Sequence, residues 1–340
     1  MMPGNPEPEH ALDFEQETGV RQIDNSTWEG VYPLKLPLQG ARGVYGGHIC
    51  AQTLLVAIKS APGCIPHSYH SNFIKPGDAT VKCTYKVKYI NNGTTSCLRQ
   101  IYVFQRDRII YTAVCALVKK GMECNSSIGR PQFAPKIPEI AKSSLSKVYK
   151  THHTDFIVNG FSDKFLNHKL CPEEKDLPIS ERWICLSSKL HQPQKGTMHD
   201  SDFNYVGLAH LSDGAILTTL ARALHLNWNP TVENAKEEFD ANKDARQLMD
   251  VSLNVMHIYH YTAMSLDHHL YFHSDLDLLD LINNWLSLTY QYKVSKNSRT
   301  LVRGHFFDHN GTCVATFFQE GLTYMRPGVA GRAEEKFSRF

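Results

Sequence analysis

Hydrophobic and polar residues follow two different periods in the first third of this chain. From His48 to Lys59 small and aliphatic side chains occupy nearly every position, and Pro62-Gly63 follows, so we expect a helix that is buried on most sides. The pattern predicts an antiparallel meander after this helix, and a further strand-like segment covers 26–38 ahead of it. The alternating segments of the meander, separated by polar turns, are 69–75, 80–91, 95–105 and 108–119.

The same order of elements returns in the last third of the chain. An apolar helix is predicted from about Asp213 to Ala223. Strand patterns follow it at 264–272, 285–295, 299–308 and 312–324. Each of the two regions therefore contains one helix and then a run of strands, as a duplicated module would.

Aligning the two regions supports duplication. When Arg99 is placed on Arg303, the strand patterns of 96–120 and 300–324 superpose at one constant offset, which sets Cys115 opposite Gln319. In the same comparison Gly47 stands opposite Asp213 at the start of the helix. Only the second copy then carries a carboxylate and an amide, and we infer one catalytic centre per chain.

A long buried helix wrapped by an antiparallel sheet, present twice, is the double hotdog architecture of the α+β class. Two such sheets can join edge to edge, which hides strand edges that each module would otherwise expose. We expect the chain to divide into an acidic, Pro-rich disordered tail, the first module, a linker rich in Lys, Ser, Pro and His with some local helix, the second module with a charged surface insertion near 227–247, and a C-terminal tail. The ranges are 1–25, 26–123, 124–201, 202–327 and 328–340.

Composition narrows the class of protein. The chain has 340 residues, 42% of them hydrophobic, and its 36 basic and 34 acidic side chains leave a net charge of only +2, so no overall field favours nucleic acid or an anionic membrane surface. Nine cysteines, an odd number without close pairs, indicate a reducing compartment. No apolar run approaches the roughly 18 residues that a membrane span requires. We therefore expect a soluble, intracellular protein.

Three residues of the second module could carry chemistry, although each has an ordinary structural explanation. Asp213 precedes an apolar helix, where a carboxylate caps the unpaired backbone donors of the first turn. Gln319 interrupts an apolar strand, where a polar residue often faces outward. Ser265 begins the strand that leads into Asp267, where a hydroxyl commonly bonds to the neighbouring backbone.

Several motifs in both halves together resemble the type II acyl-CoA thioesterases, including the bacterial and peroxisomal enzymes. The similarity covers about 26–123 and 202–327 and leaves the linker and the insertion unmatched. The motifs, in chain order, are VYGGH at 44–48, HSYHSNF at 67–73 with PGD at 76–78, LDHHLYFH at 266–273, RGHF at 303–306 and ATFFQEG at 315–321.

The resemblance implies a mechanism. In that family a carboxylate, a hydroxyl and an amide orient a water that attacks the thioester carbonyl without an acyl-enzyme intermediate. The matching positions are Asp213, Ser265 and Gln319, with Asp213 as general base. The register around Ser265 also admits Thr262 at the hydroxyl position. Coenzyme A would be part of the substrate, so no cofactor is implied.

The turn Gly46-Gly47-His48 offers bare backbone next to a helix start. Such a turn suits an acyl thioester or a phosphate, and it equally suits a tight strand-to-helix connection. We expect these three residues to contact the substrate.

Other chemistries are disfavoured by the sequence. Asp267, His268, His269 and His273 resemble a metal cluster, yet strand alternation sends the adjacent histidines to opposite faces, so we expect no metal. No Gly-x-Ser-x-Gly elbow, GxGxxG or phosphate-binding loop occurs. A hotdog enoyl-CoA hydratase usually has a His five residues after its Asp, but Thr218 stands at that spacing here.

The sequence thus predicts an acyl-CoA thioesterase that releases a free fatty acid and coenzyme A. The alternatives are a non-catalytic acyl-CoA binding protein and the hydratase. The last three residues, Ser338, Arg339 and Phe340, are similar to the Ser-Lys-Leu address read by the peroxisomal import receptor, which makes that receptor an expected partner and the peroxisome the expected location, with the cytoplasm as the alternative. Chain-length preference, the residues that hold the CoA phosphates and assembly into a homo-oligomer stay open.

Overall fold

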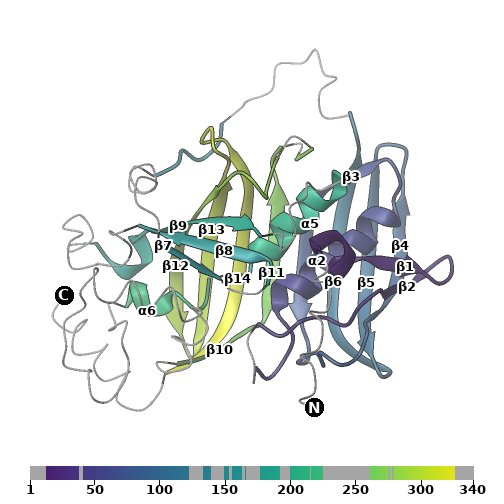
Figure 1. Ribbon diagram of the computed structural model, residues 1–340, viewed down its shortest axis with the longest axis horizontal. Helices are drawn as coiled ribbons and strands as arrows, with labels where there is room; N and C mark the ends of the chain where they lie inside the picture. The colour runs from purple at the N-terminus through teal and green to yellow at the C-terminus, as the bar shows by residue number, and fades with distance from the viewer. Residues whose placement is uncertain are drawn as a thin grey trace, which may run out of the picture.

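The computed structural model describes residues 13–37, 41–121, 133–138, 149–152, 155–162, 165, 177–191, 200–214, 216–224, 261–274, 276–277 and 279–325. One continuous antiparallel sheet of 14 strands crosses the molecule, with β10 attached beside β14 (Figure 1). The strand order along the sheet is β1-β2-β4-β5-β6-β3-β11-β14-β13-β12-β9-β8-β7.

The strands of the first half are mostly those that the alternation predicts. They are β1 (Val20–Gln22), β2 (Thr27–Gly30), β3 (Cys64–Phe73), β4 (Thr84–Asn92), β5 (Ser96–Gln105) and β6 (Arg108–Lys119). The strands of the second half are β7 (Tyr149–His152), β8 (Ile157–Phe161), β9 (Ile184–Leu190), β10 (Tyr261–Ser265), β11 (Asp267–Phe272), β12 (Leu286–Lys296), β13 (Arg299–Phe307) and β14 (Cys313–Met325).

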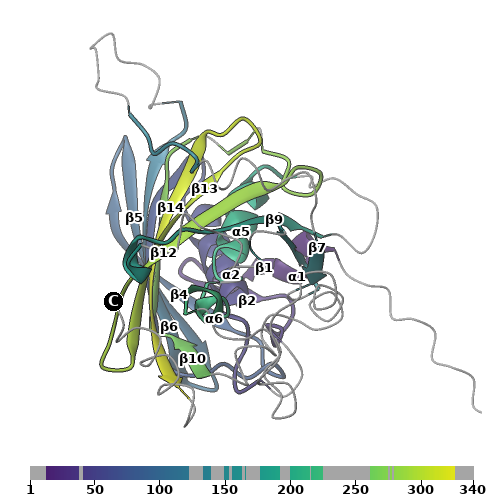
Figure 2. The same cartoon turned by 90° about the vertical axis from the view of Figure 1, so that its left-hand side faces the viewer.

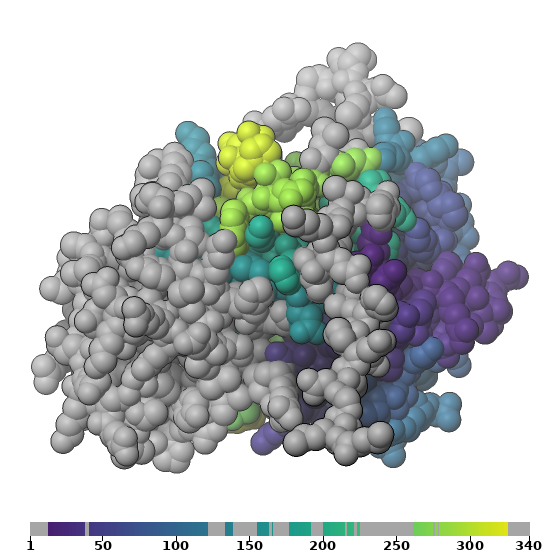
Figure 3. Space-filling view, viewed as in Figure 1, coloured from purple at the N-terminus to yellow at the C-terminus, as the bar shows by residue number. Residues whose placement is uncertain are grey.

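The predicted duplication is visible in the sheet. The order β3-β6-β5-β4 on one side mirrors β11-β14-β13-β12 on the other, and the two sets meet where β3 pairs antiparallel with β11, His70 opposite His269. Each module hides one strand edge in this junction, as predicted. On the face shown in Figure 3, atoms of the first module (purple to blue) lie to the right and second-module strands (green to yellow) to the upper centre.

The constant offset between the modules holds only in part. Arg99 pairs with Cys115, whereas Gln319 pairs with Val302 and not with Arg303. The two hairpins close through loops of different length, which shifts the register of β13 against β14 by one residue relative to β5 against β6.

Two central helices pack side by side on one face of the sheet (Figures 1 and 2). The first, α2 (Gly46–Lys59), is buried from Gly47 to Ile58, as its apolar sequence predicts. The second is α5 (Asp202–Leu211), buried from Phe203 to Leu211. The short helices α1 (Phe14–Thr18) and α6 (Leu220–Ala223) and a 3₁₀ turn at Ile179–Glu181 complete the set.

The predicted start of the second helix is wrong. The helix α5 begins at Asp202 and ends at Leu211, so Asp213 follows its C-terminus and does not cap its N-terminus. Burial of Phe203 to Leu211 stabilises the helix, and the Ser212 hydroxyl oxygen lies 2.8 Å from the carbonyl oxygen of Ala209 at its end. The counterpart of Gly47 is therefore near Asp202, and the pairing of Gly47 with Asp213 in the alignment is also wrong.

The expected linker contains strands that extend the second sheet. Strand β9 pairs with β12, and β8 pairs with β9, so these two strands belong to the second module. Every residue of Ile157–Phe161 is buried. The many polar residues in this region obscured two short apolar segments, which explains the prediction of a linker.

Part of the expected disordered tail is also folded. Asp13 and Gln16 form a capping box at the start of α1, and Phe14 is fully buried with its ring centroid 5.6 Å from that of Phe156. A single capped turn and one anchoring ring suffice to order this segment. The insertion at 227–247 and the tail at 328–340 lie outside the described residues.

No helix in the described ranges is long and apolar enough to cross a membrane. The seven cysteines that the structure describes are all free thiols.

Candidate active site

The three residues predicted from the second module lie in one hydrogen-bonded group. The amide nitrogen Nε2 of Gln319 donates to Asp213 Oδ1 at 2.6 Å and to Ser265 Oγ at 2.7 Å. The Ser265 hydroxyl lies 3.3 Å from the same carboxylate oxygen. Two side chains thus converge on Oδ1 of one carboxylate.

Three different elements bring these residues together. Asp213 lies in the turn after α5, Ser265 is the last residue of β10, and Gln319 is in the middle of β14. Strand β10 pairs with β14 so that Ser265 faces Gly321, two residues from Gln319 and therefore on the same face of the sheet. Thr262 faces Tyr324 at the other end of β10, so Ser265 is the hydroxyl that the fold brings to Asp213.

The first module contributes the backbone that closes this group. The N–H of Gly47 donates to the Asp213 carboxylate. A Cβ on Gly46 would lie well under 3.0 Å from Asp213 Oδ2, and one on Gly47 would be equally close to the carbonyl oxygen of His210. Both positions therefore require glycine, because the start of α2 approaches the end of α5 too closely for any side chain. Helix-start donors do serve Asp213, but they come from the first module's helix.

The environment adjusts the acidity of Asp213. Burial raises the pKa of its carboxyl group to about 6, and the hydrogen bonds from Gln319, Ser265 and Gly47 work in the opposite direction. The side chain keeps partial exposure to solvent. At neutral pH the group is mostly ionised, and its pKa lies close enough to neutrality to accept and return a proton.

His48 does not join the group. Its side chain is 1% exposed, and its Nδ1 accepts a hydrogen bond from the N–H of Lys35 at 3.2 Å. Burial lowers the pKa of this imidazole to about 4. The structure therefore gives His48 a core position and leaves Gly46 and Gly47 as the parts of the turn that adjoin Asp213.

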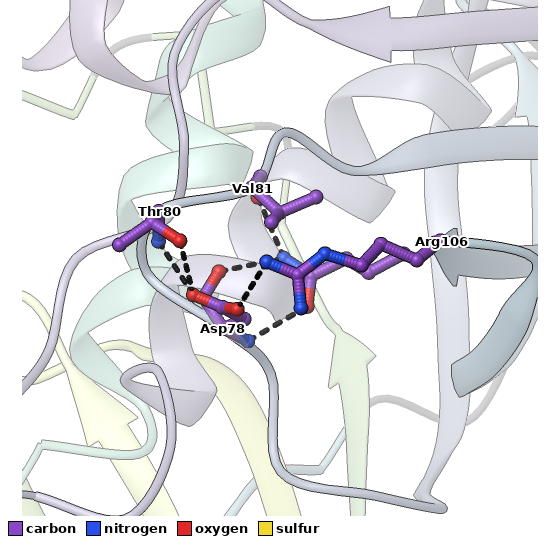
Figure 4. A network of polar contacts seen from close by, with 5 residues as sticks. Asp78, Thr80, Val81 and Arg106 are labelled. Atoms are coloured by element: carbon purple, nitrogen blue, oxygen red, sulfur yellow. Dashed lines mark hydrogen bonds and ion pairs between the residues drawn. The ribbon is translucent and has the colours of Figure 1, made fainter.

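The Pro76-Gly77-Asp78 turn holds the segment in front of α2. Val44 donates its N–H to the carbonyl of Gly77 at 3.2 Å. Gln105 accepts from the N–H of Asp78 at 2.7 Å and donates back to its carbonyl at 2.8 Å, while Arg106 pairs with the Asp78 carboxylate at 2.9 Å (Figure 4). This motif fixes the approach of Gly46 and Gly47 to the site.

Two further residues next to the site were missed by the sequence reasoning. The Tyr45 hydroxyl donates to the carbonyl of His210 at 2.7 Å, which ties the residue before α2 to the last turn of α5. His268 is fully buried, with its Nε2 2.7 Å from the hydroxyl of Ser212. A tyrosine before two glycines and a histidine in a strand give no signal on their own, because the partners lie more than 50 residues away.

The histidines of β11 alternate as predicted. His268 faces the core, while His269 is partly exposed and its ring centroid lies 5.2 Å from that of His70. In the part of the chain that the structure describes, no group of three His, Cys, Asp or Glu side chains is arranged to hold a metal ion.

Both halves of the chain match profiles of known protein families. The sequence profile of the family described as "Acyl-CoA thioesterase C-terminal domain" matches residues 144–323, and that of "Acyl-CoA thioesterase N-terminal domain" matches residues 34–118. The boundary at 144 agrees with the strands β7 to β9 being part of the second module.

Individual proteins also match most of this chain. The chain is 24% identical over 334 residues to a peroxisomal acyl-coenzyme A thioester hydrolase of Saccharomyces cerevisiae, covering 83% of this chain and 86% of that protein. The fold of this chain matches that of the acyl-CoA thioesterase II of Mycobacterium marinum with a TM-score of 0.59 at 17% identity. The match covers 92% of this chain and 98% of the Mycobacterium chain. A protein of Alicyclobacillus acidocaldarius described as having the hot dog fold matches with a TM-score of 0.59 at 13% identity, covering 92% and 98%.

Proposed function

Because the chain belongs to the acyl-CoA thioesterase family and is a thioester hydrolase that acts on acyl-CoA, we propose that Asp213, Ser265 and Gln319 carry the reaction. The observation that supports this assignment is their mutual hydrogen bonding around one carboxylate of raised pKa. Ser265 and Gln319 lie 52 and 106 positions from Asp213 along the chain, and both side chains are hydrogen-bonded to its carboxylate.

The proposed mechanism uses the two oxygens of Asp213 differently. Oδ1 is held by Gln319 and Ser265, which fixes the plane of the carboxylate. Oδ2 is directed toward the Gly46 backbone, where the side chain is partly exposed, and it accepts a proton from a bound water. The water oxygen then forms a bond to the thioester carbonyl carbon.

The reaction is completed by the return of that proton. The tetrahedral intermediate collapses by breaking the C–S bond, and the sulfur leaves as the thiol of coenzyme A after taking the proton from Asp213. The products are a free carboxylic acid and coenzyme A. The positive end of α2, which points at this region through Gly46 and Gly47, stabilises the negative charge that develops on the carbonyl oxygen.

The test is thiol release from saturated acyl-CoAs of several chain lengths, with wild-type protein beside Ser265→Ala and Gln319→Ala. Each variant loses a group that orients the carboxylate, and the loss of a positioned polar group of this kind costs about 10²- to 10³-fold in kcat. Full activity in both variants would refute the assignment. The chain length that gives the highest kcat/KM identifies the fatty acyl substrate.

We also propose a peroxisomal location through the C-terminal Ser338-Arg339-Phe340. The name of the yeast relative supports this proposal. A fluorescent protein fused in front of the full chain should give punctate fluorescence with a peroxisomal marker, and deletion of 338–340 should make it cytosolic. Unchanged import after the deletion would exclude recognition of this terminus by the import receptor.

A further inference from the structure

His268 contacts residues that are close in sequence to two members of the proposed catalytic group, Asp213 and Gln319. Its imidazole is fully buried, with Nε2 2.7 Å from the hydroxyl of Ser212, the residue before Asp213. The ring stacks on Phe317, two residues before Gln319, with ring centroids 6.2 Å apart and an interplanar angle of 24°. The His268 carbonyl also accepts from the Ser71 hydroxyl at 2.7 Å, which fixes this strand position to the first module.

Two buried polar atoms in this region make no well-formed hydrogen bond within the described residues. They are His268 Nδ1 and Gln319 Oε1. Burial lowers the pKa of His268 to about 3, and the Gln319 side chain raises it against that effect, so the amide lies next to the ring. Both hydrogens of Gln319 Nε2 are already donated to Asp213 and Ser265, so only its oxygen can serve His268.

The position of one proton decides how these atoms are satisfied. The Ser212 hydroxyl has a single hydrogen and two acceptors within reach, the Ala209 carbonyl at 2.8 Å and His268 Nε2 at 2.7 Å. If that hydrogen goes to Ala209, Nε2 carries the ring proton, and both Nδ1 and Oε1 stay unpaired acceptors. If it goes to Nε2, then Nδ1 carries the proton and can donate to Oε1; the Ala209 carbonyl at the helix end loses the Ser212 hydrogen, while the buried Nδ1 and Oε1 are both satisfied.

We propose that His268 is a positioning residue that donates from Nδ1 to Gln319 Oε1 and thereby keeps the Gln319 amide nitrogen on Asp213 and Ser265. The proposal rests on the proposed catalytic role of Gln319. Without this donor the amide can rotate by half a turn, which would set its oxygen against the Asp213 carboxylate in place of two donated hydrogen bonds.

A rotated amide has a specific consequence. Losing the Gln319 hydrogen bond, the first of the three that lower the pKa of Asp213, moves that pKa upward, so the acid limb of the pH–rate profile shifts to higher pH. The other titratable groups facing Asp213 from α2 and the residue before it, Tyr45 and Cys50, have pKa values raised by burial and stay neutral in this range. His268, with its lowered pKa, is neutral there as well.

Two amide substitutions separate the functions of the ring nitrogens. The amide nitrogen of His268→Asn can take the place of Nδ1 and donate to Gln319, whereas His268→Gln reaches toward Ser212 and lacks a donor at Nδ1. We expect His268→Asn to retain most of kcat. We expect His268→Gln to lower kcat by between about 10- and 10²-fold with little change in KM, and to move the acid limb upward. Equal losses in both variants with an unchanged acid limb would overturn the proposal.

The wild-type protein provides a second test that needs no variant. With ¹⁵N-labelled histidine, the imidazole nitrogen shifts and couplings distinguish the Nδ1–H from the Nε2–H tautomer, and we expect Nδ1–H for the buried ring of His268. An Nε2–H ring would overturn the proposal whatever the catalytic role of Gln319. Full activity of Gln319→Ala would instead refute the proposed function and leave the tautomer result standing.

Discussion

The two ends of the central helix pair carry different side chains. At one end the start of α2 meets the end of α5, and there Gly46 and Gly47 adjoin the Asp213 carboxylate. At the other end the start of α5 meets the end of α2, and there Lys59 pairs with Asp200 at 2.8 Å and with Asp202 at 3.5 Å. The first end holds a carboxylate against bare backbone, while the second is closed by partly exposed ion pairs.

The strands that pack next to the two helix ends also carry different polar side chains. Gln319 on β14 holds Asp213, whereas the sequence alignment of the two modules sets Cys115 of β6 opposite it, one residue out of register in the strand pairing. Near the end of α2 a buried guanidinium, that of Arg99, donates to the Ser60 carbonyl at 3.2 Å. The duplicated fold thus supplies two corresponding helix ends, and only one of them holds the proposed catalytic group of Asp213, Ser265 and Gln319.

Exchanging the carboxylate should produce the largest difference between the two ends. Asp213→Asn removes the proposed general base, and we expect kcat to fall by about 10²- to 10⁴-fold in a thiol-release assay. Asp202→Asn at the opposite end removes only a partly exposed ion pair with Lys59 and should leave kcat unchanged. Similar losses in the two variants would contradict the assignment of a single catalytic end.

Adding one methyl group at either end of α2 should separate activity from stability. Gly46→Ala pushes a Cβ into Asp213 Oδ2, and a displacement of about 1 Å can cost 10²-fold in kcat. Gly63, beyond the other end, has a φ of +77° and nothing within 4 Å of an added Cβ. Gly63→Ala should therefore lower the free energy of unfolding by about 1 kcal/mol without changing kcat.

Denaturant unfolding and steady-state kinetics of the two alanine variants check this prediction. A large loss of kcat in Gly63→Ala, or none in Gly46→Ala, would show that the glycines are not distinguished by their distance from Asp213.

The pH dependence should follow the Asp213 end alone. The proposed mechanism needs the ionised carboxylate, so kcat/KM should rise with pH and level off above the pKa of about 6. Because burial raises this pKa above that of the unfolded chain, the contribution of Asp213 to stability is present at low pH and is lost as pH rises through about 6. The Asp202→Asn variant should keep the same acid limb, and a shifted limb there would place the titrating group elsewhere.

The smallest expected effect is that of salt on KM, and it follows from the different charges of the two modules. Residues 41–121 contain eleven Lys and Arg and two Asp, whereas 261–325 contain four basic and six acidic residues. We therefore expect the first module to attract the phosphates of coenzyme A, so salt should raise KM for acyl-CoA by several-fold at most, with kcat unchanged. An acyl thioester of N-acetylcysteamine, which lacks the phosphates, is the control. Equal salt dependence for both substrates would exclude this attraction.

Much of the fold follows from local patterns. The apolar positions of 48–59 gave α2, and the alternating segments gave β3 to β6 and β11 to β14, because each pattern is set by neighbours within one element. The identity of the proposed catalytic residues came from motifs that are short and contiguous, such as ATFFQEG at 315–321.

Other features depend on contacts that no local pattern contains. The apolar run at 203–211 was overlooked because Asp213 resembled a helix start, and the short strands β8 and β9 were hidden in a polar region. The sequence also could not predict that the Gly47 N–H at the start of α2 donates to Asp213, or that His268 lies next to Gln319.

By itself, the sequence determined that two helix-and-sheet modules are present, that the second carries Asp213, Ser265 and Gln319, and that glycines stand before the first helix. Only the tertiary structure decided that a backbone N–H of α2 in the first module donates to the Asp213 carboxylate in the second module. It also decided that burial in this junction raises the pKa of Asp213 to about 6. Periodicity reports the surroundings of a residue within its own element. Acidity and hydrogen bonding depend on which distant elements the folded chain brings against it.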